Sequence, residues 1–211
     1  GDTYVNIGSG LPLDETVAAI AYNPAVPGEV LVGLGYTTAG RPSIYRSTDG
    51  GLTFTSVLDV SGTRGYAPEV FDIRYGASGE AWASVDYQLF HSLDDGQSWI
   101  EVLPTGPGSA VAAGTVLPIA AVPGKVYVGR GDGVYVVQYS ATPTPGYTLT
   151  AFSQGLTPNP SYLNGPTPLP AAVNRLAATP DFPASGFLFA STDGSGLFKR
   201  APVDVMLQPP W

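Results

Sequence analysis

The stretch that decides the fold is STDGGLTF at residues 47–54, which returns as SLDDGQSW at residues 92–99. Both octapeptides fit the pattern S-x-D-x-G-x-S/T-W/F, and they begin 45 residues apart (92 − 47). A repeat of this length is typical of a chain built from similar supersecondary units. An aspartate folded back over a turn can accept backbone N–H groups, and glycine adopts backbone angles that other residues avoid. The octapeptides therefore predict two equivalent turns.

The octapeptide resembles the Asp-box, or BNR repeat, of the sialidase-like and sortilin-like β-propeller family. The resemblance implies that each copy forms the turn between the third and fourth strands of a propeller blade. It also implies structural roles for the defining residues, with the aromatic side chain anchoring the hairpin by packing. These structural Asp-box residues are Ser47, Asp49, Gly51, Phe54, Ser92, Asp94, Gly96 and Trp99.

Two further repeats extend the pattern over most of the chain. AVPGEVLVGLG at residues 25–35 returns as AVPGKVYVGRG at residues 121–131, and ASGEAWASVD at 77–86 parallels ASGFLFASTD at 184–193. Each copy is a turn that leads into a short apolar strand and then a second turn. These repeats predict an all-β propeller with about four blade-like units.

The alignment of the repeats predicts the strands of each unit. STDG at residues 191–194 then falls between a second and a third strand, so we do not count it as an Asp-box. The expected strands are 17–22, 30–35, 43–47 and 52–58; 70–75, 81–85, 88–92 and 98–103; 116–121, 126–129, 134–139 and 147–152; and 173–178, 187–190 and 196–200.

We expect residues 1–211 to form a single β-propeller domain. The fourth unit lacks an outer strand, and residues 2–12 resemble the outer strand and exit at 147–157, so we predict that they complete the last blade. Residues 201–211 are expected to be a C-terminal tail. Pairing terminal strands in one blade closes a ring and removes exposed edges. The alternatives are a closed four-bladed ring, a part of a larger ring, and pairing of the N-terminal strand with another copy.

Composition excludes several classes of function. The net charge is −8 and only residues 199–200 are adjacent basic residues, which argues against a nucleic-acid partner. Cysteine is absent and His91 is the single histidine, so disulfides and Ser-His or Cys-His nucleophiles are not expected. The sequence contains no stretch of about 18 apolar residues, so no membrane span is expected. We place His91 at a polar strand position, in the slot of Arg46 in the first unit and of Lys199 or Arg200 in the last.

The enzymatic alternative is a glycoside hydrolase that uses paired carboxylates. Sialidase activity is disfavoured because the F/Y-R-I-P motif before the first Asp-box is absent. The candidate carboxylates are Asp86, Asp132 and Asp193, which recur at turns between second and third strands and could line an acidic mouth that binds a sugar or a cation. Aspartate is also a favoured turn residue, and no metal-ligand spacing accompanies these positions. We therefore expect no metal, no cofactor and no catalytic residue.

The function we predict is a non-catalytic interaction or structural module, with a protein partner or self-assembly into an oligomer. The alternative is a carbohydrate-binding or glycoside-hydrolase-type propeller. A weaker similarity, to the propeller that assists photosystem assembly, is disfavoured because that family relies on a basic patch. The interaction candidates are Tyr4, Tyr162 and Trp211.

Low charge and the family resemblance predict an extracellular or cell-surface location, with the periplasm as a further option. The sequence begins with Gly1 and its single methionine is Met206, from which we expect a processed or excised chain.

Overall fold

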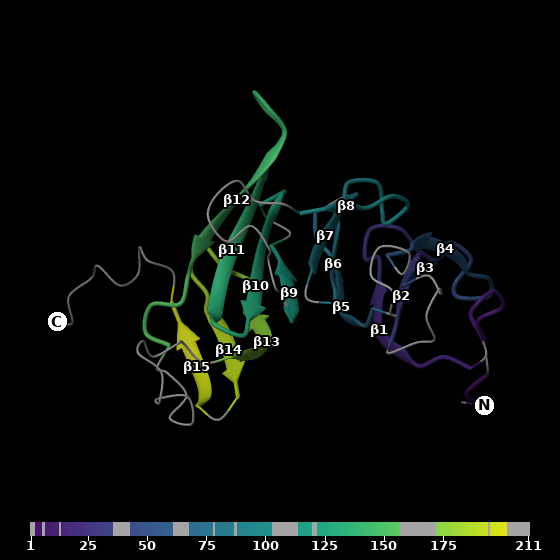
Figure 1. The fold of residues 1–211 in the computed structure, drawn as a ribbon, viewed down its shortest axis with the longest axis horizontal. Coiled ribbons are helices and arrows are strands. Elements are labelled where there is room, and N and C mark those ends of the chain that lie inside the picture. The colour runs from purple at the N-terminus through teal and green to yellow at the C-terminus, as the bar shows by residue number, and fades with distance from the viewer. Residues whose placement is uncertain are drawn as a thin grey trace. The chain divides into compact units, whose positions relative to one another are not determined.

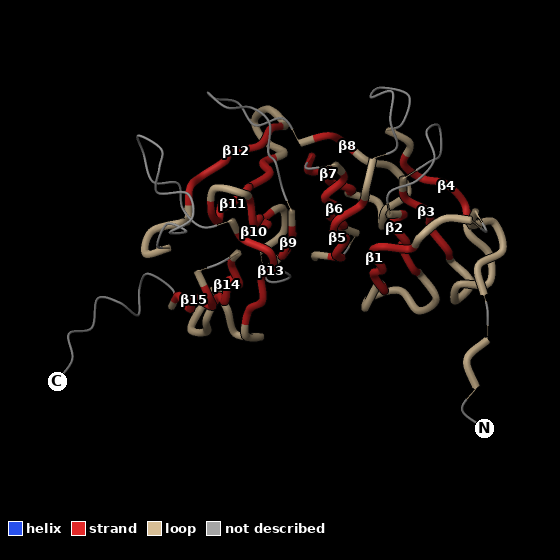
Figure 2. Tube along the Cα trace, turned by 60° about the horizontal axis from the view of Figure 1, so that its bottom comes forward, coloured by secondary structure: helices blue, strands red, loops and turns tan. Residues whose placement is uncertain are grey.

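The computed structural model describes residues 3–5, 7–12, 14–35, 43–60, 68–77, 79–86, 88–102, 114–119, 122–156, 172–193 and 195–201. All regular elements in these ranges are β-strands (Figure 2), and they form four separate antiparallel sheets. The predicted all-β fold is therefore confirmed. Within the same ranges, no helix is long and apolar enough to cross a membrane.

The first compact unit, Gly1–Val102, contains two four-stranded sheets, labelled in Figure 1. In each sheet every strand pairs antiparallel with the strand before and after it in the sequence, which is the meander expected of a propeller blade. The first sheet contains β1 (Val17–Tyr22), β2 (Val30–Leu34), β3 (Ile44–Ser47) and β4 (Thr55–Leu58). The second contains β5 (Val70–Tyr75), β6 (Ala81–Val85), β7 (Gln88–Ser92) and β8 (Ile100–Glu101).

The second compact unit, Leu103–Trp211, contains a four-stranded and a three-stranded sheet (Figure 1). The four-stranded sheet contains β9 (Thr115–Pro118), β10 (Lys125–Arg130), β11 (Gly133–Ser140) and β12 (Gly146–Ala151). The three-stranded sheet contains β13 (Val173–Ala178), β14 (Leu188–Thr192) and β15 (Gly196–Arg200). The described residues thus give the fourth sheet three strands, as the sequence alignment predicts.

A glycine near the end of the second strand lets the next sheet approach closely in both units. A Cβ added at Gly33 would lie 2.4 Å from Cγ1 of Val70, and one added at Gly129 would lie 2.6 Å from Cγ1 of Val173. Both valines begin the inner strand of the following sheet. The repeated V-G motif therefore marks a contact between sheets, and only a residue without a side chain fits there.

Apolar side chains from both sheets of a unit share one core. In the first unit, Ile44 of the first sheet is buried with Ala83 and Phe90 of the second. In the second unit, Tyr127 of the third sheet is buried with Leu176 and Leu188 of the fourth. Each pair of sheets is therefore held face to face by hydrophobic packing.

The strands after the two octapeptides begin later than the sequence indicates. We predict strands over 52–58 and 98–103, whereas the structure has Thr55–Leu58 and Ile100–Glu101. The reason is local: the side chain of Asp49 accepts the N–H of Thr53, which keeps residues up to Phe54 in the turn.

The N-terminal segment contacts the first sheet where the structure describes it. Ser9 forms an isolated parallel bridge with Thr53, and the N–H of Phe54 donates to the carbonyl of Ser9 at 2.7 Å. Leu11 packs against the same sheet beside Phe54. The pairing of residues 2–12 with the fourth sheet, and the single domain over 1–211, stay predictions.

Candidate functional site

The first octapeptide folds into a turn whose donors are met by two side chains. The Ser47 hydroxyl donates to Asp49 Oδ1 at 2.8 Å and accepts the N–H of Gly51 at 2.9 Å. Asp49 also accepts the N–H of Thr53 at 2.9 Å and the Thr53 hydroxyl at 2.6 Å. Buried Phe54 follows directly. Both oxygens of the carboxylate thus accept hydrogen bonds that hold the turn.

The second octapeptide repeats the same bonds. The Ser92 hydroxyl donates to Asp94 Oδ1 at 2.8 Å and accepts the N–H of Gly96 at 2.9 Å. Asp94 accepts the N–H of Ser98 at 2.8 Å and the Ser98 hydroxyl at 2.6 Å. Trp99 donates its indole N–H to the carbonyl of Gly96 at 3.2 Å. Identical side-chain roles at both turns explain why the sequence repeats these residue types.

These hydrogen bonds also hold the two aspartates in their charged form. Bonds from the Thr53 side chain and backbone, and from Ser47, lower the pKa of Asp49 from 3.8 to about 2. Partial burial acts to raise the pKa of Asp94, but bonds from Ser98 and Ser92 outweigh it and leave that pKa lowered. A carboxylate with a depressed pKa is a poor proton donor near neutral pH, so neither group suits general acid catalysis.

A buried polar network joins the second turn to the first sheet. Asn23 donates to Glu29 Oε2 at 2.7 Å and to Asp95 Oδ1 at 3.0 Å. Arg46 forms an ion pair with Glu29 and donates from Nε to the Asp95 carbonyl at 3.0 Å. Burial, together with the charges of Glu29 and Asp95, raises the pKa of nearby Tyr75. Because these groups bind one another, the network acts as a clamp between two sheets.

His91 occupies a fully buried strand position. Its ring stacks on Trp82 with a centroid distance of 3.7 Å, and Nε2 lies 3.6 Å from Glu80 Oε1. Trp82 pairs with His91 in the same register in which Phe189 pairs with Lys199, so Lys199 rather than Arg200 is the equivalent residue of the last sheet. This enclosure leaves no room for a substrate beside the imidazole.

The three candidate carboxylates all lie at turns that follow a second strand. The N–H of Asp86 donates to the Glu69 carbonyl at 2.7 Å, and the N–H of Asp193 donates to the Ala172 carbonyl at 2.9 Å, so these two positions are equivalent. In the first sheet the N–H of Gly35 makes the same bond, to the Thr16 carbonyl at 2.7 Å. The repeat of residues 25–35 at 121–131 aligns Gly35 with Gly131, so the corresponding position of the third sheet lies one residue before Asp132.

Asp132 is engaged by its neighbours. Arg130 Nε lies 3.0 Å from Asp132 Oδ1, and the Tyr135 hydroxyl donates to Asp132 Oδ2 at 3.0 Å. In the described ranges, no cluster of three or more His, Asp or Glu side chains is placed to hold a metal ion.

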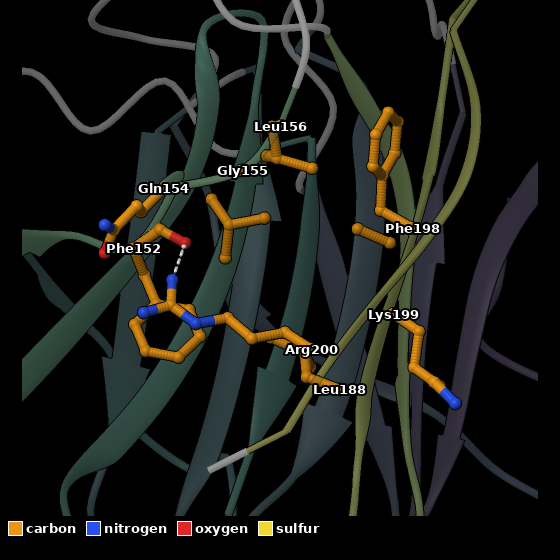
Figure 3. A pocket seen from close by; sticks show the side chains of 10 residues that line it. Phe152, Gln154, Gly155, Leu156, Leu188, Phe198, Lys199 and Arg200 are labelled. Carbon is orange, nitrogen blue, oxygen red and sulfur yellow. Dashed lines mark hydrogen bonds between the residues drawn. The ribbon is translucent and has the colours of Figure 1, made fainter. Parts of the chain in front are cut away.

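The most distinctive open feature is a pocket of about 180 Å³ in the second unit, lined by strands β11, β14 and β15 and by the exit of β12. Figure 3 shows the guanidinium of Arg200 lying on the Phe152 ring, with Phe198 and Leu156 at the other end. Arg200 donates to the Phe152 carbonyl at 2.8 Å, and its Cζ lies 3.6 Å from the ring centroid. The pocket therefore combines apolar walls with two basic side chains, Arg200 and Lys199.

The apolar walls belong to the core that joins the two sheets. Tyr127 contacts Phe152 edge-on with a centroid distance of 5.1 Å and Phe182 at 5.2 Å. Burial raises the pKa of Tyr127, although the nearby charge of Arg200 opposes this. The Arg200 guanidinium thus lies between a packed aromatic floor and an open pocket.

The predicted interaction residues lie elsewhere or outside the described part of the chain. Tyr4 is fully exposed in the N-terminal segment of the first unit. Tyr162 and Trp211 lie outside the described residues. Residues 5 and 7–12 line a broader hollow with Val17 and Leu52 on the first sheet.

The sequence interpretation missed the pocket residues Phe152, Phe198 and Arg200. A signal was present: Arg200 aligns with Ser47 and Ser92, and no octapeptide starts there. The last unit therefore departs from the repeat where the pocket opens.

Comparison with known proteins supports the fold. No family model and no curated protein sequence matches the chain. Among solved structures, YCF48 bound to D1 peptide is similar, with 18% identity, a TM-score of 0.56, and coverage of 92% of this chain and 54% of that chain. YCF48 from Cyanidioschyzon merolae has 16% identity, a TM-score of 0.57, and coverage of 92% and 55%. The GH74 xyloglucanase from Xanthomonas campestris has 17% identity, a TM-score of 0.54, and coverage of 89% and 29%.

These similar structures are β-propellers, so the predicted propeller fold is confirmed. The chain spans about half the length of the two YCF48 structures. At such low identity the likeness shows the fold alone, since propellers serve many unrelated functions.

Proposed function

We propose that this chain is a non-catalytic β-propeller module, of the kind that carries Asp-box turns, and that it binds another protein. The observation that carries the proposal is the pocket beside Arg200, which opens at the edge strand of the fourth sheet. The edge strand of a sheet beside an apolar pocket is a common place for a peptide to bind. A structural neighbour of this chain was solved with a bound peptide, which favours the same class of ligand.

The state of the carboxylates supports a non-catalytic role. Asp49 and Asp94 hold turns, and Asp132 is paired with Arg130 and Tyr135. Retaining and inverting glycosidases need two carboxyl groups facing one scissile bond, one of which donates a proton. Asp49, Asp94 and Asp132 are instead bound into turns and ion pairs of the protein itself.

The carbohydrate-active alternative keeps one favourable observation, which is the similarity to a GH74 xyloglucanase. On that hypothesis Asp86 and Asp193 would contribute from equivalent turns. An extracellular or cell-surface location and assembly into an oligomer belong to the same proposal as the protein-binding role.

A two-part experiment separates these functions. Partners are captured with the intact chain, identified, purified and recombined with it to measure a dissociation constant. In parallel, the chain is assayed for release of reducing ends from a panel of polysaccharides that includes xyloglucan. A reconstituted protein complex without turnover supports the module. Turnover that is lost in Asp86→Asn or Asp193→Asn, with unchanged thermal unfolding, would refute it.

A further inference from the structure

The pocket beside Arg200 occupies a place that an aromatic side chain fills in the two sheets of the first unit. In the first sheet, Phe54 packs in one buried cluster with Val32 of the second strand and Tyr45 of the third. In the second sheet, Trp99 packs against the cluster that contains Ala83 and Phe90. Each of these aromatic residues directly precedes the fourth strand of its sheet.

The strand registers identify the equivalent residues of the fourth sheet. Ala190 pairs with Phe198 in the register in which Ala83 pairs with Phe90 and Val32 with Tyr45. Ala190 and Phe198 both line the pocket. The fourth sheet has three strands in the described residues, and the description of the chain after β15 extends only to residue 201.

The size of the pocket fits one side chain. Its volume of about 180 Å³ is below the range of about 300–1,000 Å³ that is typical of small-molecule sites. A single aromatic ring entering from a neighbouring strand has the right shape and chemistry, because Phe54 and Trp99 do this in the first unit. The repeat itself therefore indicates what the pocket accepts.

The outer edge of β15 offers backbone groups for the same ligand. In the second sheet, the N–H of Val102 donates to the carbonyl of Leu89. The backbone N–H and C=O groups of Leu89 and His91 therefore face the fourth strand. Leu197 and Lys199 are the equivalent residues of β15. Because antiparallel strands alternate their hydrogen-bonding directions, Leu197 and Lys199 present their N–H and C=O groups to the outer edge.

The positive charge at this edge favours an acidic ligand. Lys199 and Arg200 are the one pair of adjacent basic residues in a chain of net charge −8. Arg200 uses one of its five N–H donors on the Phe152 carbonyl, and the guanidinium geometry suits a carboxylate as a second partner. The segment that binds here should therefore be acidic.

We infer that the fourth sheet takes an extended, acidic segment of a partner protein as its fourth strand, antiparallel to β15, with one aromatic side chain in the pocket beside Arg200. The inference rests on the proposed protein-binding function and names its site. The C-terminal residues 202–211 are a poor occupant. At the spacing of the Asp-box, Pro209 and Pro210 would fall in the strand, and proline has no N–H to pair with an edge.

The probe for the test is a fluorescent peptide with the sequence of residues 94–104, DDGQSWIEVLP, which is the chain's own fourth strand from the second sheet. Binding to the full chain is followed by fluorescence anisotropy. We expect saturable binding that weakens at least about tenfold when the peptide carries Trp99→Ala. N-methylation at Val102, whose N–H faces the edge, should abolish binding, whereas N-methylation at Glu101, whose N–H faces away, should have little effect.

Variants of the protein complete the test. Arg200→Glu should weaken binding about tenfold or more. Arg175→Glu makes the same charge change on β13, the other edge strand of the sheet, and should leave affinity within about twofold. The peptide variants keep the test valid if Arg200→Glu disturbs folding.

Several outcomes would overturn the inference. These are absence of saturable binding, equal affinity for the Trp99→Ala peptide, and equal loss on methylation at either position. Tight binding of a peptide of residues 2–12, or binding of the probe only after residues 1–12 are removed, would assign the edge to the chain's own N-terminal segment. A dimer that the probe dissociates would assign it to a second copy. A purified partner that binds Arg200→Glu as tightly as wild type would leave the proposed function standing and remove this site.

Discussion

Substitution of Gly129 by alanine tests the contact between sheets that underlies the repeat. The new Cβ would lie 2.6 Å from Val173 Cγ1 and 2.7 Å from Thr115 Cγ2, well inside ordinary van der Waals separation. Forcing extra atoms into a packed core costs about 1–3 kcal/mol, and two contacts of this closeness place the expected loss near 2 kcal/mol. At about 2–4 °C per kcal/mol for a chain of this size, the melting temperature should fall by about 4–8 °C.

Gly131 provides a matched control two residues further along. A Cβ at Gly131 would meet no atom within 4 Å, so Gly131→Ala should be neutral or stabilise by up to about 1 kcal/mol. Urea unfolding followed by tryptophan fluorescence measures both variants.

A double-mutant cycle isolates the contact itself. Val173→Ala alone should cost about 2 kcal/mol through lost burial. In that background Gly129→Ala should cost at least about 1 kcal/mol less, because the methyl group it would strike is gone. An undiminished cost in the Val173→Ala background, or an equal cost for Gly131→Ala, would refute the reasoning.

Two further predictions concern charged groups of the first unit. Arg46→Met should destabilise the protein by about 3–5 kcal/mol, because it leaves Glu29 buried without its ion partner. Arg74→Met, which removes a largely exposed partner of Asp72, should cost less than about 1 kcal/mol, and equal urea midpoints for the two variants would contradict the clamp. The second prediction concerns pH. Because the folded-state pKa of Asp49 is about 2 and the ordinary value is 3.8, its carboxylate stabilises the fold above about pH 4, and this stabilisation is lost as the pH falls through about 2. The difference in urea midpoint between wild type and Asp49→Asn should therefore be largest near pH 6 and shrink toward pH 2. A difference that is constant over this range would contradict the role of the charged carboxylate.

The sequence was most informative where the structural role of a residue is set by its local backbone. The glycines and aspartates of residues 47–54 and 92–99 predict turns because their backbone angles and acceptors are local properties, and the structure places both octapeptides between third and fourth strands. The predicted first residues of the strands that follow these turns were less accurate. The bond from Thr53 to Asp49 extends the turn, and a residue pattern alone does not show which competing hydrogen bond is formed.

The candidate site depended on relations that no local pattern carries. The V-G repeat was visible, but its reason lies in Val70 and Val173, which are distant in sequence and close in space. The pocket was missed because it arises where the last unit departs from the repeat, at Arg200, and because its aromatic wall at Phe152 comes from another sheet. Long-range packing of this kind becomes visible only when the strand registers are known.

The most direct test of the account is hydrogen exchange of the β15 amides with and without the probe peptide of residues 94–104. If a partner strand adds to β15, the amides of Leu197 and Lys199 should exchange fast in the free chain and become protected at least about tenfold when the peptide is bound. The Trp99→Ala peptide, at the same concentration, should give little protection. Binding that leaves these two amides unprotected, or that protects residues of the first unit instead, would contradict strand addition at β15.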